Sequence, residues 1–141
     1  MSKSLRVYVL DTSACLTLIE DESGADAVQE LVEKAQAGEV VLLTSFMSYM
    51  EVYYITLQER NAEEARARLD LIASLPALRV ESSQAIGIVA AEIKAHHRLS
   101  VADAWIAALA KVHEAVLVHK DPEFEQVGSI LPILSLPFKG Q

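Results

Sequence analysis

Four acidic residues stand apart from the other acids of the chain, because each lies in or directly after an apolar stretch. They are Asp11, Glu51, Asp103 and Asp121. An ionised carboxylate in apolar surroundings needs a partner or a cation, since an unpaired buried charge is very costly. Like charges that meet in one pocket cannot all stay ionised without a cation. Because ligand sets made only of oxygen favour Mg²⁺ or Mn²⁺ over zinc, the four acids predict a divalent-metal site.

A metal site of this kind suits the hydrolysis of a phosphodiester. The metal lowers the pKa of a bound water and stabilises the charge of an in-line phosphoryl displacement. The sequence shows no rival motif: it has no glycine-rich phosphate loop, no cysteine pair and no His-Glu-x-x-His. His119 lies two residues before Asp121, so a place beside the same pocket is one hypothesis for it.

Two of the acids lie inside predicted helices, and each has a structural alternative. Glu51 is the only charged residue between positions 46 and 57, which favours a carboxylate that binds a partner or a cation. The structural alternative is a Glu on the one solvent-facing edge of this helix. Asp103 follows Ser100 at capping-box spacing, and an acid in a first helical turn complements the helix dipole. A first-turn Asp can cap a helix and still face a crevice, so both interpretations of Asp103 stay open.

The other two acids come just after predicted strands, Asp11 immediately and Asp121 after His119 and Lys120. In open α/β sheets, ligands bind at the carboxyl ends of the strands, which places Asp11 and Asp121 at a shared crevice. Asp121 precedes Pro122, a common helix start, and Asp11 could cap the helix that follows it. Thr12 or Ser13 could cap that helix without an acid. The joint pattern of four acids therefore carries more weight than any one of them.

Strands alternate with helices along the chain, which predicts parallel βαβ units. Apolar runs predict strands at 5–10, 39–44, 78–80 and 115–118, and an edge strand at 133–134 between two prolines. Helical periodicity and cap residues predict helices at 13–20, 23–38, 45–59, 61–75, 83–98 and 101–112, with a helical turn at 121–122. The predicted fold class is α/β, a three-layer α/β/α sandwich around a parallel sheet. We expect one domain over residues 1–141.

Composition limits the partners that the chain can have. Hydrophobic residues make up 52% of the 141 residues, enough for one core, and the net charge is −8. That charge counts against broad nucleic-acid binding and suits a basic partner protein. Any nucleic acid must reach a local patch or be held through metal. The basic group Lys94, His96, His97 and Arg98 could guide RNA locally, and a solvated helix end explains it as well.

Three further features bear on location and assembly. Asp11 interrupts a signal-peptide core early, and no uncharged apolar stretch is long enough to cross a bilayer, so we expect a cytoplasmic protein without membrane association. The single cysteine, Cys15, is expected in the core. The helix at 45–59 is apolar almost all round, which predicts burial or a subunit interface.

These residues resemble those of the PIN-domain ribonucleases, especially the VapC-like toxins of type II toxin–antitoxin pairs. The resemblance rests on Val9-Leu10-Asp11-Thr12-Ser13, on Thr44-Ser45 followed by Glu51, on Leu99-Ser100-Val101-Ala102-Asp103-Ala104, and on Lys120-Asp121 with Phe124. It implies a PIN-like fold and Mg²⁺- or Mn²⁺-dependent RNA cleavage, with Asp11, Glu51, Asp103 and Asp121 as the catalytic and metal-binding acids. It also implies a homodimer and an antitoxin that masks the site, often with a basic side chain. One departure is His119, where many relatives have Thr.

The sequence-based hypothesis is therefore a metal-dependent endoribonuclease that acts as a toxin. Asp11 and Asp103 would be the principal metal ligands. Glu51 would bind a metal or orient the attacking water, and Asp121 would complete the site. The alternative is a non-catalytic PIN-like module that binds a protein or RNA partner, although the presence of all four acids argues against a degraded site. A phosphate-receiver domain fits less well, because the second predicted strand leads into Thr44-Ser45 rather than an acceptor Asp.

Overall fold

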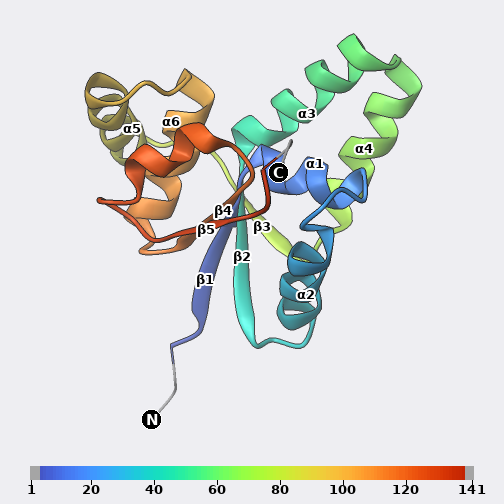
Figure 1. The fold of residues 1–141 in the computed structure, drawn as a ribbon, viewed down its shortest axis with the longest axis horizontal. Helices are drawn as coiled ribbons and strands as arrows, with labels where there is room; N and C mark the ends of the chain where they lie inside the picture. The colour runs from blue at the N-terminus through green and yellow to red at the C-terminus, as the bar shows by residue number, and fades with distance from the viewer. Residues whose placement is uncertain (1–3, 139–141) are drawn as a thin grey trace.

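A computed structural model describes residues 4–138 of the chain, and its centre is a five-stranded parallel sheet (Figure 1). The strand order is β3-β2-β1-β4-β5. The strands are β1 (Arg6–Leu10), β2 (Val40–Ser45), β3 (Ala77–Val80), β4 (Val116–His119) and β5 (Ile133–Ser135). All four neighbouring pairs are parallel. The predicted parallel sheet is confirmed, and so is the edge position of β5.

Helices cover both faces of this sheet, so the three-layer prediction is confirmed. They are α1 (Thr12–Ile19), α2 (Ala25–Gln36), α3 (Phe46–Glu59), α4 (Ala62–Ser74), α5 (Gln84–His96), α6 (Val101–Val112) and the 3-10 helix η1 (Pro122–Val127). Side chains of α1 to α4 pack with Leu10 on one face, and those of α5, α6 and η1 pack with Val9 on the other. Within residues 4–138, none of the helices is both long and apolar enough to cross a membrane.

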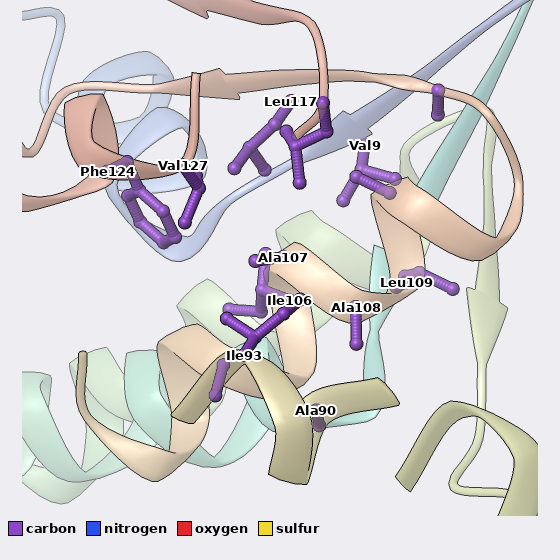
Figure 2. Packing of buried hydrophobic residues seen from close by; sticks show 14 of the residues in the cluster. Val9, Ala90, Ile93, Ile106, Ala107, Ala108, Leu109, Leu117, Phe124 and Val127 are labelled. Carbon is purple, nitrogen blue, oxygen red and sulfur yellow. The ribbon is translucent and has the colours of Figure 1, made fainter. Parts of the chain in front are cut away.

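The core beside α6 fixes the elements that carry two of the acids. Figure 2 shows Val9 and Leu117 of the sheet facing Ile106 and Ala107 of α6, and all four side chains are fully buried. Phe124 of η1 is also fully buried against this cluster. Because Phe124 comes three residues after Asp121, its burial holds the turn after β4 against α6.

The α3–α4 pair forms a hairpin beside α1 (Figure 1). Helix α3 is less buried than its apolar sequence suggests, since Met50, Tyr54 and Leu57 are 56%, 42% and 41% exposed. On α4, by contrast, a charged side chain is buried: Arg68 is only 3% exposed. Its guanidinium lies 3.0 Å from Glu20 Oε1 and therefore ties α4 to the end of α1.

Three local predictions need correction. The first helix begins at Thr12 rather than Ser13, and Asp11 is its N-cap. Strand β4 extends to His119, which is fully buried. The helix predicted from residue 23 begins at Ala25, and its N-cap is Gly24, with φ +103° and no side-chain cap bond. An added Cβ at Gly24 would lie 3.1 Å from Leu136 Cβ, so this tight turn needs glycine.

Side chains cap three other helices, and the cap at Ser100 expected from its spacing to Asp103 is confirmed. Asn61 caps α4, Ser83 caps α5 and Ser100 caps α6, each by accepting a backbone N–H three residues on. Cys15 is 1% exposed, and burial raises the pKa of its thiol to about 12, which fits an inert core residue.

Candidate metal centre

Asp11 lies at the carboxyl end of β1, and the two oxygens of its carboxylate have different surroundings. Its backbone N–H donates to Val118 O at 2.9 Å, which joins it to the end of β4. Its Oδ2 accepts the Ser13 N–H at 2.9 Å and so caps α1. Among the residues described, Oδ1 is buried without any hydrogen-bond partner. A buried carboxylate oxygen left unpaired is costly, so this atom points to a missing proton or cation.

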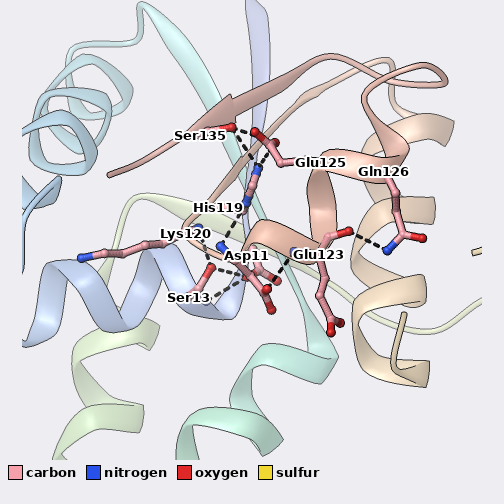
Figure 3. A network of polar contacts seen from close by, with 9 residues as sticks. Asp11, Ser13, His119, Lys120, Glu123, Glu125, Gln126 and Ser135 are labelled. Atoms are coloured by element: carbon pink, nitrogen blue, oxygen red, sulfur yellow. Dashed lines mark hydrogen bonds and ion pairs between the residues drawn. The ribbon is translucent and has the colours of Figure 1, made fainter. Parts of the chain in front are cut away.

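Ser13 connects the ends of the two central strands (Figure 3). Its hydroxyl donates to Asp11 Oδ2 at 2.5 Å and accepts the Lys120 N–H at 2.8 Å. The Lys120 ammonium reaches the other way, to Ser23 O at 2.8 Å and Glu22 Oε1 at 3.5 Å. The lysine nearest to Asp121 in sequence therefore pairs outside the acidic group.

Glu51 reaches the site from α3 through the residue next to Asp11. Thr12 Oγ1 donates to Glu51 Oε1 at 2.7 Å and lies 3.0 Å from Ser48 Oγ. Burial raises the pKa of Glu51, the Thr12 bond lowers it, and the charge of Asp121 raises it further. This contact pattern favours the site interpretation of Glu51 over a carboxylate on the outer edge of the helix.

Asp103 lies in the first turn of α6 and is also acted on by the other three predicted acids. Its N–H donates to Ser100 Oγ at 3.1 Å, so it belongs to the capped first turn of α6. Burial raises the pKa of its carboxyl to about 8, helped by the charges of Asp11, Glu51 and Asp121, in that order. For Asp11, burial is again the largest cause and raises the pKa to about 7. The four predicted acids therefore interact electrostatically, with Asp103 acted on by the other three.

The turn after β4 brings a fifth acid that sequence reasoning missed. Asp121 caps η1 by accepting the Glu123 N–H at 3.0 Å. Asp103, Asp121 and Glu123 each offer one carboxylate oxygen, and these atoms lie within 4.8 Å of one another. The available signal was the Asp-Pro-Glu sequence, because a capping Asp turns the residue two positions on toward its own side chain.

The sequence makes His119 a candidate for the lining of the pocket, and the basic group at the end of α5 a candidate for guiding RNA. The contacts of their histidines favour other roles. His119 is fully buried at the end of β4, with Nδ1 accepting the Asp121 N–H at 3.1 Å, so it supports the turn from behind. Burial lowers the pKa of this imidazole. His96 and His97 bond through Nδ1 to carbonyls of their own helix, which favours a helix-end role for both. Guidance of RNA by this group stays a prediction.

The donor set fits a divalent cation. Carboxylate oxygens of Asp103, Asp121 and Glu123 lie within 4.8 Å of one another. The buried, unpaired Asp11 Oδ1 is outside that closely spaced group, and the charge of Asp11 acts on Asp103. The pKa values of Asp11, Glu51 and Asp103 are all raised, so the group tolerates its full negative charge poorly. Hard, oxygen-preferring cations such as Mg²⁺ and Mn²⁺ offset this kind of charge.

A cleft of about 370 Å³ adjoins the acids and runs between α1, the end of α3 and the segment after β4. Ser13 and Asp121 belong to its lining. Its apolar lining comes from Leu16, Ile55, Pro122 and Phe138, its acidic lining includes Glu20, Glu22 and Glu59, and Lys120 is its basic lining residue. Glu20 and Glu22 pair with Arg68 and Lys120, respectively. A partner that fills this cleft would combine apolar and basic side chains.

Comparisons with known proteins find the same fold elsewhere. The model of the PIN domain family matches residues 8–130. One chain of the VapBC2 complex from Rickettsia felis, bound to a promoter DNA fragment, is 19% identical and has a TM-score of 0.75, covering 93% of this chain and 99% of that one. A chain of DNA-bound VapBC from Salmonella typhimurium is 19% identical, with a TM-score of 0.73 and coverages of 94% and 98%.

A third similar structure is VapC20 of Mycobacterium tuberculosis, described as a toxin that cleaves the sarcin–ricin loop. It is 16% identical, with a TM-score of 0.68 over 86% of this chain and 95% of that one. At these identities the likeness shows the shared fold. A search of curated proteins finds no match.

The raised pKa values predict how the stability of the metal-free protein depends on pH. Folded Asp11 and Asp103 keep protons that the unfolded chain releases near pH 3.8, so the folded state binds more protons up to about pH 8. The free energy of unfolding should therefore fall by roughly 1–3 kcal/mol as the pH rises from about 4 to about 8. Saturating Mn²⁺ should remove this decline, because the cation replaces the protons. Urea unfolding at a series of pH values measures it.

The test variant is Asp103→Asn. Its matched control is Asp70→Asn, which removes an exposed carboxylate on α4. The decline should shrink in the first variant and persist in the second. His119, whose pKa burial lowers, contributes an opposite slope to both variants, so their difference isolates Asp103. Equal slopes in the two variants would contradict the electrostatic account of the site.

Proposed function

Because the chain belongs to the PIN domain family, we propose that it is a metal-dependent endoribonuclease that acts as the toxin of a toxin–antitoxin pair. The observation that carries the proposal is the buried, unpaired Asp11 Oδ1, which lies in a group of mutually repelling carboxylates at the ends of β1 and β4. The relative VapC20, described as cleaving the sarcin–ricin loop, supports RNA as the substrate.

The proposed roles follow from the contacts of each side chain. Asp11, Asp103 and Asp121 would hold Mg²⁺ or Mn²⁺, with Glu51 bound directly or through water. The cation, when bound, supplies a water of lowered pKa and offsets the charge that develops on the phosphate. Thr12 holds Glu51 by Oε1, so Oε2 is the atom that would take the proton of the attacking water. The raised pKa of Glu51 suits this work as a general base near neutral pH.

An antitoxin is the proposed protein partner. Similar structures support this partner: one is described as a toxin–antitoxin complex from Klebsiella pneumoniae, and another as a member of the VapBC family of toxin–antitoxin systems. The lining of the cleft holds more acidic than basic side chains beside its apolar ones, and the whole chain carries a charge of −8, so both suit a basic amphipathic segment. A segment that entered the cleft would end beside Asp121 and block the site.

Two further parts of the proposal concern assembly and location. The exposed Met50, Tyr54 and Leu57 on α3 support a homodimer, because such side chains gain from burial against a second subunit. A cytoplasmic location, where messenger, transfer and ribosomal RNA are accessible, stays part of the proposal.

The direct test is cleavage of an end-labelled RNA pool with Mn²⁺, with and without chelator. Wild-type protein should cut RNA, and chelator should abolish the cutting. Asp103→Asn should lower the rate by about 100-fold or more, because it removes a charged ligand while keeping the shape of the side chain. Asp70→Asn on the exposed side of α4 should cleave like the wild type.

Cleavage that survives chelator, or that Asp103→Asn leaves unchanged, would contradict the metal-nuclease proposal. No cleavage together with no Mn²⁺ binding by calorimetry would favour the non-catalytic binding module instead.

The partner proposal predicts a charge effect at the mouth of the cleft. Glu59→Lys should weaken binding of the purified antitoxin by about tenfold, which corresponds to about 1.4 kcal/mol. Glu63→Lys makes the same charge change on the neighbouring helix α4, outside the cleft lining, and should have little effect. Isothermal titration calorimetry at moderate salt measures both, and equal weakening by the two variants would show a general charge effect without a docking site.

A further inference from the structure

His119 is a buried polar residue next to the metal-binding turn, and the mechanism above gives it no role. Its side chain is fully buried at the end of β4, against the Phe124 ring at a centroid distance of 5.2 Å. A buried imidazole needs partners for both ring nitrogens, and here Nδ1 has one and Nε2 has two. The identity of these partners shows what the residue does.

The first nitrogen holds the backbone of the acidic turn. The Asp121 N–H donates to His119 Nδ1 at 3.1 Å. This bond spans two residues, as in the turns that Asn, Asp, Ser and Thr side chains form with their own backbone. Asp121 in turn accepts the Glu123 N–H at Oδ1, at 3.0 Å. The imidazole therefore holds the backbone of Asp121, and the Asp121 carboxylate holds the backbone of Glu123. The carboxylates of these two residues lie beside that of Asp103.

The second nitrogen fixes the proton of the ring. Because Nδ1 accepts a hydrogen bond, a neutral ring carries its proton on Nε2. Nε2 lies 3.2 Å from Glu125 Oε2 and 3.2 Å from Ser135 Oγ. Ser135 itself donates to Glu125 Oε2 at 2.9 Å. The Glu125 carboxylate thus accepts from both neighbours and favours the tautomer that leaves Nδ1 free to accept.

Figure 3 shows this line of contacts, from Ser135 on the edge strand β5 through Glu125 and His119 to the turn beside Asp11. Every member comes from a different place in the chain: β5, η1 and the end of β4. The network therefore ties the position of the acidic turn to the edge of the sheet, independently of any metal.

We propose that His119 is a positioning residue, which holds the Asp121 and Glu123 carboxylates against Asp103 by accepting the Asp121 N–H at Nδ1. The inference rests on the proposed function, since it assigns a role within that metal site. Groups that orient metal ligands typically change metal affinity by about 10- to 100-fold when they are removed. Glu125 and Ser135 act one step further out, by fixing the ring.

The test compares His119→Asn with His119→Leu. The two side chains have the same branched shape, and both lose the contacts of Nε2. Asn keeps an acceptor, Oδ1, where Nδ1 lies, whereas Leu has none. The measurements are Mn²⁺ affinity by calorimetry, thermal stability, and the exchange rate of the Asp121 amide proton by NMR in the metal-free protein.

We expect His119→Asn to bind Mn²⁺ within about threefold of the wild type and His119→Leu to bind about tenfold or more weakly. The Asp121 amide should stay protected from exchange in the wild type and His119→Asn, and exchange faster in His119→Leu. A merely structural role would lower stability in both variants and would not separate their metal affinities.

Three outcomes would overturn the inference. They are wild-type Mn²⁺ affinity in His119→Leu, equal loss of affinity in both variants, and equal Asp121 exchange in all three proteins. A wild type that binds no Mn²⁺ would overturn the proposed function as well. The Asp121 exchange rates would then show separately whether His119 holds the turn, so the two failures can be told apart.

Discussion

Repulsion among carboxylates at the carboxyl ends of β1 and β4 is the constraint on which the rest of the structure depends. Burial is the largest cause of the raised pKa of Asp103, and the charges of Asp11, Glu51 and Asp121 raise it further. A folded chain that gathers these groups must hold each one by other bonds. It does so with backbone N–H groups and hydroxyls, from Ser13 at Asp11 and from Thr12 at Glu51. The charge that remains unbalanced is what a divalent cation would offset.

The bonds that hold the acids are mostly those of helix caps. An acid at a helix start can therefore belong to a cap and still offer a carboxylate oxygen to a cation. A carboxylate has two oxygens, so Asp11 caps α1 with Oδ2 and leaves Oδ1 unpaired. Asp121 caps η1, and Asp103 lies in the capped first turn of α6. The partial positive charge of a helix N-terminus also favours a nearby anion. Three helix starts therefore meet at the acids, which the parallel topology makes possible by bringing strand ends to one edge.

Much of this arrangement could be predicted because its signals are local. A short apolar run followed by an acid and a cap residue defines the end of β1, and Ser100 with Asp103 defines the start of α6. Signals that depend on packing were missed. Glu123 looks like one acid of a solvated run until the turn places it beside Asp103. Arg68 lies among acids on α4, and only the fold brings Glu20 to it from 48 residues away. The partners of His119 lie 2, 6 and 16 residues away in sequence, and only the fold of the segment after β4 brings them to its ring. That the four predicted acids bind metal stays a prediction.

The central claim, that these carboxylates form a cation site, is tested most directly by anomalous diffraction from crystals soaked in MnCl₂. We predict an anomalous peak bonded to Asp11 Oδ1 and to carboxylate oxygens of Asp103 and Asp121, absent from crystals soaked with MgCl₂ under the same conditions because Mg²⁺ scatters too weakly. The peak should also be absent from MnCl₂-soaked crystals of Asp103→Asn. A Mn²⁺ peak only at exposed acids elsewhere, with Asp11 Oδ1 unbound, would contradict the account.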